Sequence, residues 1–321
     1  MAEVSLRIVD GPERVAELRT EDMRAALAKR PDLVFVASTG RTPVQTYRAW
    51  GRAGLDLSKV HLRMLDAYLL SPSRGFTSTN HAGSFSRYVH ESVLGPLDVA
   101  KRPRDWSMLP EDVATCEEVT AQLEQQPEAW DRVLHPISGE PGAEFVLHET
   151  ATGVLAAIRR TCEAYDRLLN GDPLGIVSLG VGPLPYPHMA FNTGPFTRAD
   201  APTHLTLLDT STRQANAEPF GDVDSVPPFA LTLGPGTLVS AAVCWVSAVG
   251  ASKSSAVTHA LGDPRVPDFA LRSSLGYVLK ANHVDIVLDE AAAADITADA
   301  GLAGLEQRYR EAGHGMAARR V

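Results

Sequence analysis

The sequence predicts an α/β fold: a doubly wound, mainly parallel sheet with helices on both faces, the Rossmann-like three-layer sandwich. Short apolar runs of strand length alternate with longer helical segments, which is typical of parallel sheets whose strands are connected through helices. Small, polar or charged residues directly follow several of these runs, as they do at the ligand-binding edge of such a sheet. The 321 residues show no internal repeat and no low-complexity tail, so we expect a single α/β domain over 1–321.

In chain order, each predicted strand is a short apolar run, and each predicted helix is a longer segment with apolar residues at helical spacing. The run Val34-Phe35-Val36 is typical of a strand buried on both faces, and Pro43 fits an early position in the next helix. The predicted strands are 33–37, 60–65, 175–179, 204–208, 242–249 and 284–288, and the predicted helices are 12–29, 42–53, 153–169, 252–261 and 303–318. Residues 110–149 mix Glu, Gln, Pro and Gly without a clear period, which predicts an insertion that is helical around 116–126.

Composition and charge exclude several classes of function. A net charge of −9 argues against nucleic acid as the main partner, because binding to a phosphate backbone normally needs a basic surface. No apolar stretch is long enough to cross a bilayer, the N-terminal residues do not read as a signal peptide, and the three cysteines are far apart. We therefore expect a cytoplasmic protein without a membrane partner, and no Cys/His spacing predicts a metal. The number of subunits stays open, a homo-oligomer included.

The segment after the first predicted buried strand has the composition of a phosphate-binding loop. Ser38, Thr39, Gly40, Arg41 and Thr42 stand between the strand and a helix, so hydroxyls and backbone N–H groups can face an anion beside the helix N-terminus. The alternative is an ordinary connection, since short loops of Gly, Ser and Thr are common between a strand and a helix.

Other polar residues follow neighbouring strands at the same predicted edge. Ligands in open α/β sheets bind beyond the carboxyl ends of the strands, which makes these residues candidates for a site. They are Asp66, the glycines Gly180 and Gly182 that lead to His188, and Lys253. Each has a structural alternative: the aspartate would cap a turn, the histidine would be a buried structural residue, and the lysine would lie on the surface.

Eight segments in a fixed order resemble one known family. They are Ser-Thr-Gly-Arg-Thr-Pro at 38–43, Met-Leu-Asp-Ala-Tyr at 64–68, Cys-Glu-Ala-Tyr-Asp at 162–166, Gly-Val-Gly-Pro at 180–183, His-Met-Ala-Phe-Asn at 188–192, Pro-Phe-Ala-Leu-Thr-Leu-Gly at 228–234, Gly-Ala-Ser-Lys at 250–253 and Val-Leu-Asp-Glu-Ala at 287–291. Together they resemble the glucosamine-6-phosphate deaminase and 6-phosphogluconolactonase family. The segment 188–192 is more similar to the deaminase branch.

The resemblance implies a sugar 6-phosphate as substrate and no cofactor. It implies that the loop 38–42 and Lys253 hold the phosphate, and that Gly180, Gly182 and Asn192 also belong to the binding site. It further implies that Asp66 removes the C2 proton of the open-chain sugar and that His188 helps to open the ring. These roles suit the residue types, because a carboxylate is a competent base and histidine exchanges protons near neutral pH.

The chain also departs from the deaminase pattern at four places. Ala67 and Thr193 stand where deaminases carry glutamate, the loop 183–187 is longer by two residues and lacks an aspartate, and Glu218 stands where an arginine assists the phosphate. The histidine therefore lacks its usual carboxylate neighbours, which would favour its charged form. Arg41 is a candidate replacement for the lost phosphate clamp, with a surface arginine as the alternative and Arg213 as a weaker candidate.

These departures predict a divergent reaction. An enolate formed at C2 can expel the C3 hydroxyl without the guided proton return that isomerisation needs, so we expect dehydration of an amino-sugar 6-phosphate, with the nitrogen free or acetylated. Three alternatives stay open: an orthodox deaminase or isomerase, a lactonase, and a sugar-phosphate sensor without catalysis.

Overall fold

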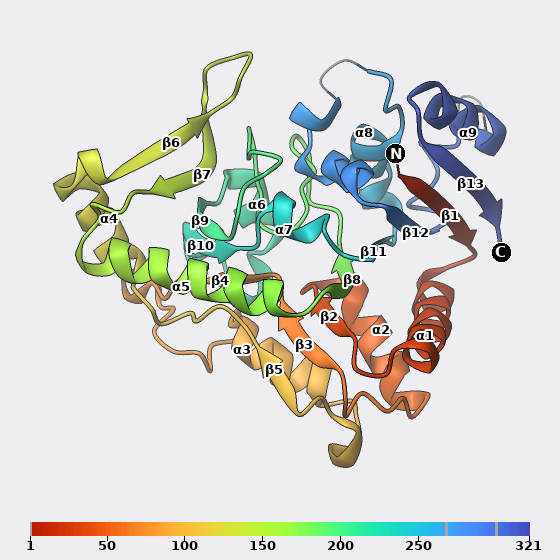
Figure 1. The fold of residues 1–321 in the computed structure, drawn as a ribbon, viewed down its shortest axis with the longest axis horizontal. Coiled ribbons are helices and arrows are strands. Elements are labelled where there is room, and N and C mark those ends of the chain that lie inside the picture. Colours follow the sequence, from red (N-terminus) through yellow and green to blue (C-terminus); the bar gives the residue numbers. More distant parts are fainter. Residues whose placement is uncertain (1, 267–268, 299–300) are drawn as a thin grey trace.

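The computed structural model describes residues 2–266, 269–298 and 301–321, and its centre is a parallel sheet of eight strands (Figure 1). The strand order is β13-β1-β12-β11-β8-β2-β3-β5, and all of its neighbouring strands pair in parallel. The strands are β1 Glu3–Val9, β2 Val34–Ala37, β3 His61–Met64, β5 Asp105–Ser107, β8 Leu174–Leu179, β11 Val243–Ala248, β12 His283–Asp289 and β13 Gly315–Arg320. This arrangement confirms the predicted α/β fold.

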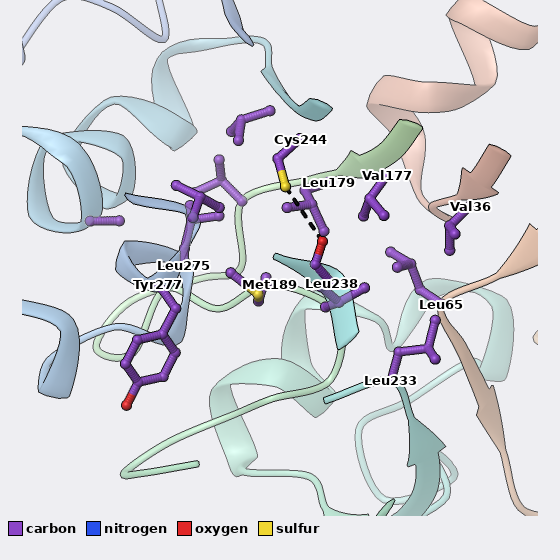
Figure 2. Packing of buried hydrophobic residues seen from close by; sticks show 14 of the residues in the cluster. Val36, Leu65, Val177, Leu179, Met189, Leu233, Leu238, Cys244, Leu275 and Tyr277 are labelled. Atoms are coloured by element: carbon purple, nitrogen blue, oxygen red, sulfur yellow. Dashed lines mark hydrogen bonds between the residues drawn. The ribbon is translucent and has the colours of Figure 1, made fainter. Parts of the chain in front are cut away.

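Helices cover both faces of the parallel sheet because successive strand residues point to opposite sides. Phe35 packs with residues of α1 (Pro12–Lys29) and α2 (Arg41–Arg52), whereas Val34 and Val36 pack in the cluster that includes α5 (Gly153–Gly171), α8 (Ser254–Leu261) and α9 (Gly301–Glu311). Figure 2 shows part of the second cluster, in which Val36, Val177 and Leu179 of the sheet lie near Leu65 and Leu233. Strands that are apolar on both faces thus produce the three layers that the sequence predicts.

A second sheet, which is antiparallel, extends the fold on one side (Figure 1). Its order is β4-β10-β9-β7-β6, with β4 at Asp66–Tyr68, β10 at Phe229–Thr232, β9 at His204–Leu207, β7 at Pro141–Leu147 and β6 at Trp130–Leu134. The prediction that 204–208 belongs to the parallel sheet is therefore wrong: β9 pairs antiparallel with β10 and β7. An apolar run identifies a strand but does not identify its partners.

Leu65 connects the two sheets along the chain. Met64 ends β3 in the parallel sheet, and Asp66 begins β4 in the antiparallel sheet. The Leu65 N–H donates to the Ala37 carbonyl oxygen (3.3 Å), and the Leu65 carbonyl accepts from the Leu233 N–H (2.9 Å). The backbone at Leu65 is therefore held by both sheets.

The segment predicted as an insertion contributes a helix and two strands. Helix α4 covers Cys116–Gln125, as predicted, and starts with a capping box in which Thr115 and Glu118 bind each other's backbone N–H groups. Strands β6 and β7 form a hairpin that projects from the body in Figure 1. The remaining short helices are α3 Phe85–Tyr88, α6 Thr210–Ala215 and α7 Pro235–Leu238.

The predicted terminal helix at 303–318 needs a correction. Helix α9 ends at Glu311, Gly313 turns the chain with φ +83°, and residues Gly315–Arg320 pair in parallel with β1 as strand β13. Alanines in this stretch favour helix, but the unpaired edge of β1 offers backbone hydrogen bonds that a continued helix would leave unused. No helix among the described residues is long and apolar enough to cross a bilayer.

Candidate active site

The carboxyl ends of β2, β3, β8 and β11 lie at one edge of the parallel sheet, and the predicted site residues follow them. Contacts between neighbouring loops join them in series. The Ser38 hydroxyl lies 3.1 Å from that of Ser178, and Lys253 Nζ donates to the Val181 carbonyl oxygen at 2.6 Å. A Cβ added to Gly182 would lie within 2.6 Å of ring atoms of His188, so glycine is needed where the ring packs on the backbone. The structure thus brings the phosphate loop, the glycines, the histidine and the lysine together.

The phosphate-loop candidate leads directly into helix α2. Gly40 is its N-cap, with φ +110°, a conformation that residues with a Cβ rarely adopt, and no side chain caps the helix. The loop backbone is fixed by two tyrosines: the Tyr47 hydroxyl donates to the Ser38 carbonyl (2.8 Å) and the Tyr88 hydroxyl donates to the Gly40 carbonyl (3.1 Å). The first N–H groups of a twelve-residue helix are therefore left for an anion.

Arg41 extends from this loop to another segment of the chain. Its Nη2 lies 2.5 Å from Glu218 Oε2, and the two side chains are 86% and 74% exposed. Glu218 is the residue that stands where the resemblance implies an arginine. Arg213, the weaker candidate, is turned away, because its Nη2 donates to the Val223 carbonyl (2.7 Å). Of the two arginines, Arg41 is thus the one that lies at the phosphate loop, where it forms an ion pair with the Glu218 carboxylate.

Asp66 is buried where the two sheets meet, with only 5% of its surface exposed. One oxygen, Oδ1, accepts the Phe191 N–H (2.9 Å) and the Thr232 hydroxyl (2.5 Å). Burial outweighs these two hydrogen bonds and raises the pKa of Asp66 to about 7. Within the described residues no hydrogen bond to Oδ2 is present, so this oxygen is the one that can take up a proton.

His188 is held at both ring nitrogens and is 7% exposed. Nδ1 lies 2.5 Å from the Ala190 carbonyl oxygen, and Nε2 lies 3.1 Å from the Thr212 hydroxyl. The carbonyl reaches the ring because Ala190 has φ +49°, in the left-handed region that alanine seldom occupies. Burial lowers the pKa of His188, and burial also lowers that of Lys253 nearby. In this arrangement neither ring nitrogen is free for a substrate.

Asn192 braces the segment that carries His188. Its Nδ2 donates to the carbonyl oxygens of Met189 (3.0 Å) and Leu233 (2.8 Å), so it ties this segment to the end of β10. This contact helps to hold the Phe191 N–H over Asp66. Asn192 Oδ1 is buried and has no hydrogen-bond partner among the described residues.

Several residues of the site were missed by sequence reasoning. Thr232 lies within the predicted 228–234 motif, but nothing in the sequence marks its hydroxyl as the partner of Asp66. Ser178, Thr212 and Asp209 carried no signal, because they lie inside a strand or in a segment without a recognised motif. Among the described residues, no group of three or more His, Cys, Asp or Glu side chains is placed to hold a metal ion.

Comparison with known proteins identifies the class of fold. No family model matches the chain. A solved monomeric glucosamine-6-phosphate deaminase superposes with a TM-score of 0.66 at 23% identity, covering 91% of this chain and 99% of the other. The 6-phosphogluconolactonase from Trypanosoma cruzi superposes with a TM-score of 0.60 at 13% identity, covering 92% and 98%. The fold is the one shared by these deaminases and lactonases.

Curated proteins that are similar in sequence to this chain include glucosamine-6-phosphate deaminases. The glucosamine-6-phosphate deaminase of Streptomyces coelicolor is 26% identical over 298 residues, 90% of this chain and 91% of the relative. That of Arthrobacter sp. is 25% identical over 297 residues, also 90% and 91%. The chain is thus similar in sequence to curated glucosamine-6-phosphate deaminases over about nine tenths of its length, which confirms the resemblance found in the motifs.

Proposed function

We propose that this protein acts on an amino-sugar 6-phosphate and removes the C2 proton with Asp66. The observation that carries the proposal is the state of this carboxyl group, which is buried, anchored through one oxygen and has a pKa raised to about 7. A base works best when its pKa is near the working pH, because it is then both ionised and able to accept a proton. The relatives named above are deaminases, and such chemistry begins at C2.

The phosphate group is assigned to the loop 38–42 and Lys253. The uncapped N-terminus of α2 supports this assignment, since its N–H groups and its dipole favour an anion. Lys253 Nζ is held at the neighbouring loop after β8, because it donates a hydrogen bond to the Val181 carbonyl oxygen. Gly182 and Asn192 hold the His188 segment close, Gly180 lies in the same loop, and we assign all three to the sugar side of the site.

Dehydration is the outcome that we favour after C2 deprotonation. The C2–H bond breaks as Asp66 takes the proton, and its electron pair forms the enolate; the C3–O bond then breaks as the leaving hydroxyl takes the proton from Asp66 and departs as water. Isomerisation would instead need a proton delivered to C1. Both nitrogens of His188 are bound by protein atoms, and Ala67 and Thr193 replace acidic residues, so these three positions offer no second acid to assist that delivery.

An orthodox glucosamine-6-phosphate deaminase is the second candidate, favoured by the names of the curated relatives. The two reactions share the first step and differ in their products. Proton NMR in D₂O separates them, with glucosamine 6-phosphate and N-acetylglucosamine 6-phosphate as substrates. Loss of the C2 proton signal together with a new vinylic signal supports dehydration, whereas ammonia and fructose 6-phosphate in equal amounts contradict it. Unchanged spectra with both sugars contradict both reactions.

The pairing of Arg41 with Glu218 gives a prediction for substrate binding. Glu218→Gln removes the competing carboxylate, so KM for the sugar phosphate is expected to fall by up to about fivefold, the usual range for an exposed ion pair. Arg41→Met is expected to raise KM, and Arg48→Met on the same helix serves as the control with no change. Steady-state kinetics at low ionic strength makes the measurement. Equal KM values for all four proteins would remove Arg41 from the phosphate site.

A further inference from the structure

A carboxylate approaches His188 from an unexpected direction, the start of helix α6. Asp209 is the N-cap of this helix and accepts the Thr212 N–H (2.8 Å) and the Ser211 hydroxyl (2.5 Å) with Oδ1. Its other oxygen, Oδ2, lies 3.1 Å from the Thr212 hydroxyl. That hydroxyl lies 3.1 Å from His188 Nε2, and Thr212 is fully buried. Carboxylate, hydroxyl and imidazole thus form one continuous chain.

Asp209 lies close to the position at which the deaminase pattern has a glutamate and this sequence has Thr193. Thr193 stands where the deaminase pattern has an acidic residue, and the next residue, Gly194, donates its N–H to Asp209 Oδ2 at 3.3 Å. The carboxylate therefore reaches the same neighbourhood from the end of β9 instead of from the histidine segment.

The hydrogen bonds that join Asp209, Thr212 and His188 can hold their protons in two arrangements. A carbonyl only accepts, so Nδ1 keeps its proton for Ala190 in both. The Thr212 hydroxyl has one proton to donate. If Thr212 donates its proton to Nε2, the ring is neutral. If Thr212 donates to Asp209 instead, the contact between Thr212 and Nε2 is a hydrogen bond only when Nε2 carries a second ring proton and donates it to the hydroxyl oxygen. The states differ by one proton at Nε2 and by a rotation of one hydroxyl group.

The charges around the ring oppose each other. Asp209 favours the charged ring, while Lys253 and burial favour the neutral ring. Among the described residues, the Thr212 hydroxyl is the group that lies within hydrogen-bond distance of both Nε2 and the Asp209 carboxylate, so it couples Asp209 to Nε2.

We propose that Asp209 and Thr212 are positioning residues that set the protonation of His188 at Nε2. When the ring takes up a proton there, the Thr212 hydroxyl turns from Nε2 to Asp209 Oδ2, and Nδ1 remains bound to Ala190. The pair supplies from α6 the carboxylate that Ala67 and Thr193 do not provide. The proposal rests on the proposed function only in placing His188 at the sugar-phosphate site.

The test is a pH titration of the imidazole nitrogens by NMR on the full chain labelled with ¹⁵N-histidine, without substrate. In the wild type the neutral ring is expected to carry its proton on Nδ1. Thr212→Val keeps the shape but removes the hydroxyl, and it is expected to weaken proton binding at His188 about tenfold, the usual worth of a hydrogen bond to a charged group. Thr212→Ser restores the hydroxyl and the wild-type titration.

Ser211→Ala is the matched control, because this variant also removes a hydroxyl donor from Asp209 but not one that contacts His188. It is expected to titrate as the wild type does. A neutral ring protonated on Nε2, or the same midpoint in Thr212→Val and the wild type, overturns the proposal. The NMR measurement needs no turnover, so an unreactive protein with the expected titrations would refute the proposed function and leave this inference standing.

Discussion

Asp66→Asn is expected to lower kcat for C2 proton removal by about a thousandfold, within the usual contribution of a general base. The amide keeps an oxygen for the Phe191 N–H and the Thr232 hydroxyl, so the fold should be retained while the proton acceptor is lost. In the wild type, kcat is expected to rise with pH and to level off above about pH 7, because the pKa of Asp66 is raised to about 7 and only its ionised form accepts a proton. Exchange of the C2 proton with D₂O gives both measurements.

Thr232 provides the control that assigns this pH dependence to Asp66. Thr232→Val removes a hydrogen bond to the ionised carboxylate, so the midpoint of the kcat profile is expected to move to higher pH. Thr232→Ser should leave it in place. A profile that levels off near pH 5 in the wild type, or that Thr232→Val does not move, would show that another group is titrating.

Arg19→Met is expected to destabilise the protein by about 3 kcal/mol, the cost of breaking a buried charged network. Arg19 is 1% exposed and lies under the phosphate loop, where it lines a small cavity with Ser38 and Thr42. Its Nη2 donates to the carbonyl oxygens of Val246 (2.9 Å) and Asp285 (2.7 Å), two hydrogen bonds that methionine cannot make. Urea unfolding followed by circular dichroism measures the change.

Arg14→Met on the same helix is the matched control. Arg14 forms ion pairs with Glu17 (3.3 Å) and Glu21 (2.8 Å) at the surface, where such pairs contribute less than about 1 kcal/mol. If the two variants lose the same stability, the buried network around Arg19 does not stabilise the fold as its contacts indicate.

The sequence predicts five of the eight parallel strands, β2, β3, β8, β11 and β12, because each is a short apolar run; β1, β5 and β13 were not predicted as strands. Residues 12–29 form the helix predicted for them, and β2, β8 and β11 lie within about one residue of their predicted limits. The antiparallel sheet was not predicted, since β4 has only three residues and β10 lies in a motif with no helical or strand period to separate it. Strand β13 was assigned to a helix because pairing with β1 depends on tertiary structure.

The residues of the candidate site could likewise be predicted only in part. Residues that directly follow strands, such as Ser38, Asp66 and Lys253, could be found from their place in the chain, because parallel strands end at a common edge. The partners that adjust them could not. Thr232, Thr212 and Asp209 reach Asp66 or His188 only through contacts between segments that are far apart in the sequence, and no local pattern records such contacts.

Because of the junction at Leu65, the position of the proposed base Asp66 depends on both sheets. The backbone of Leu65 is bonded to Ala37 of the parallel sheet on one side and to Leu233 beyond β10 on the other, and Asp66 is the next residue. The phosphate loop directly follows β2 of the first sheet, and Thr232 belongs to β10 of the second. The spacing between the phosphate loop and the Asp66 carboxylate therefore depends on the join between the sheets at Leu65, and a sugar phosphate that contacts both groups would span this join.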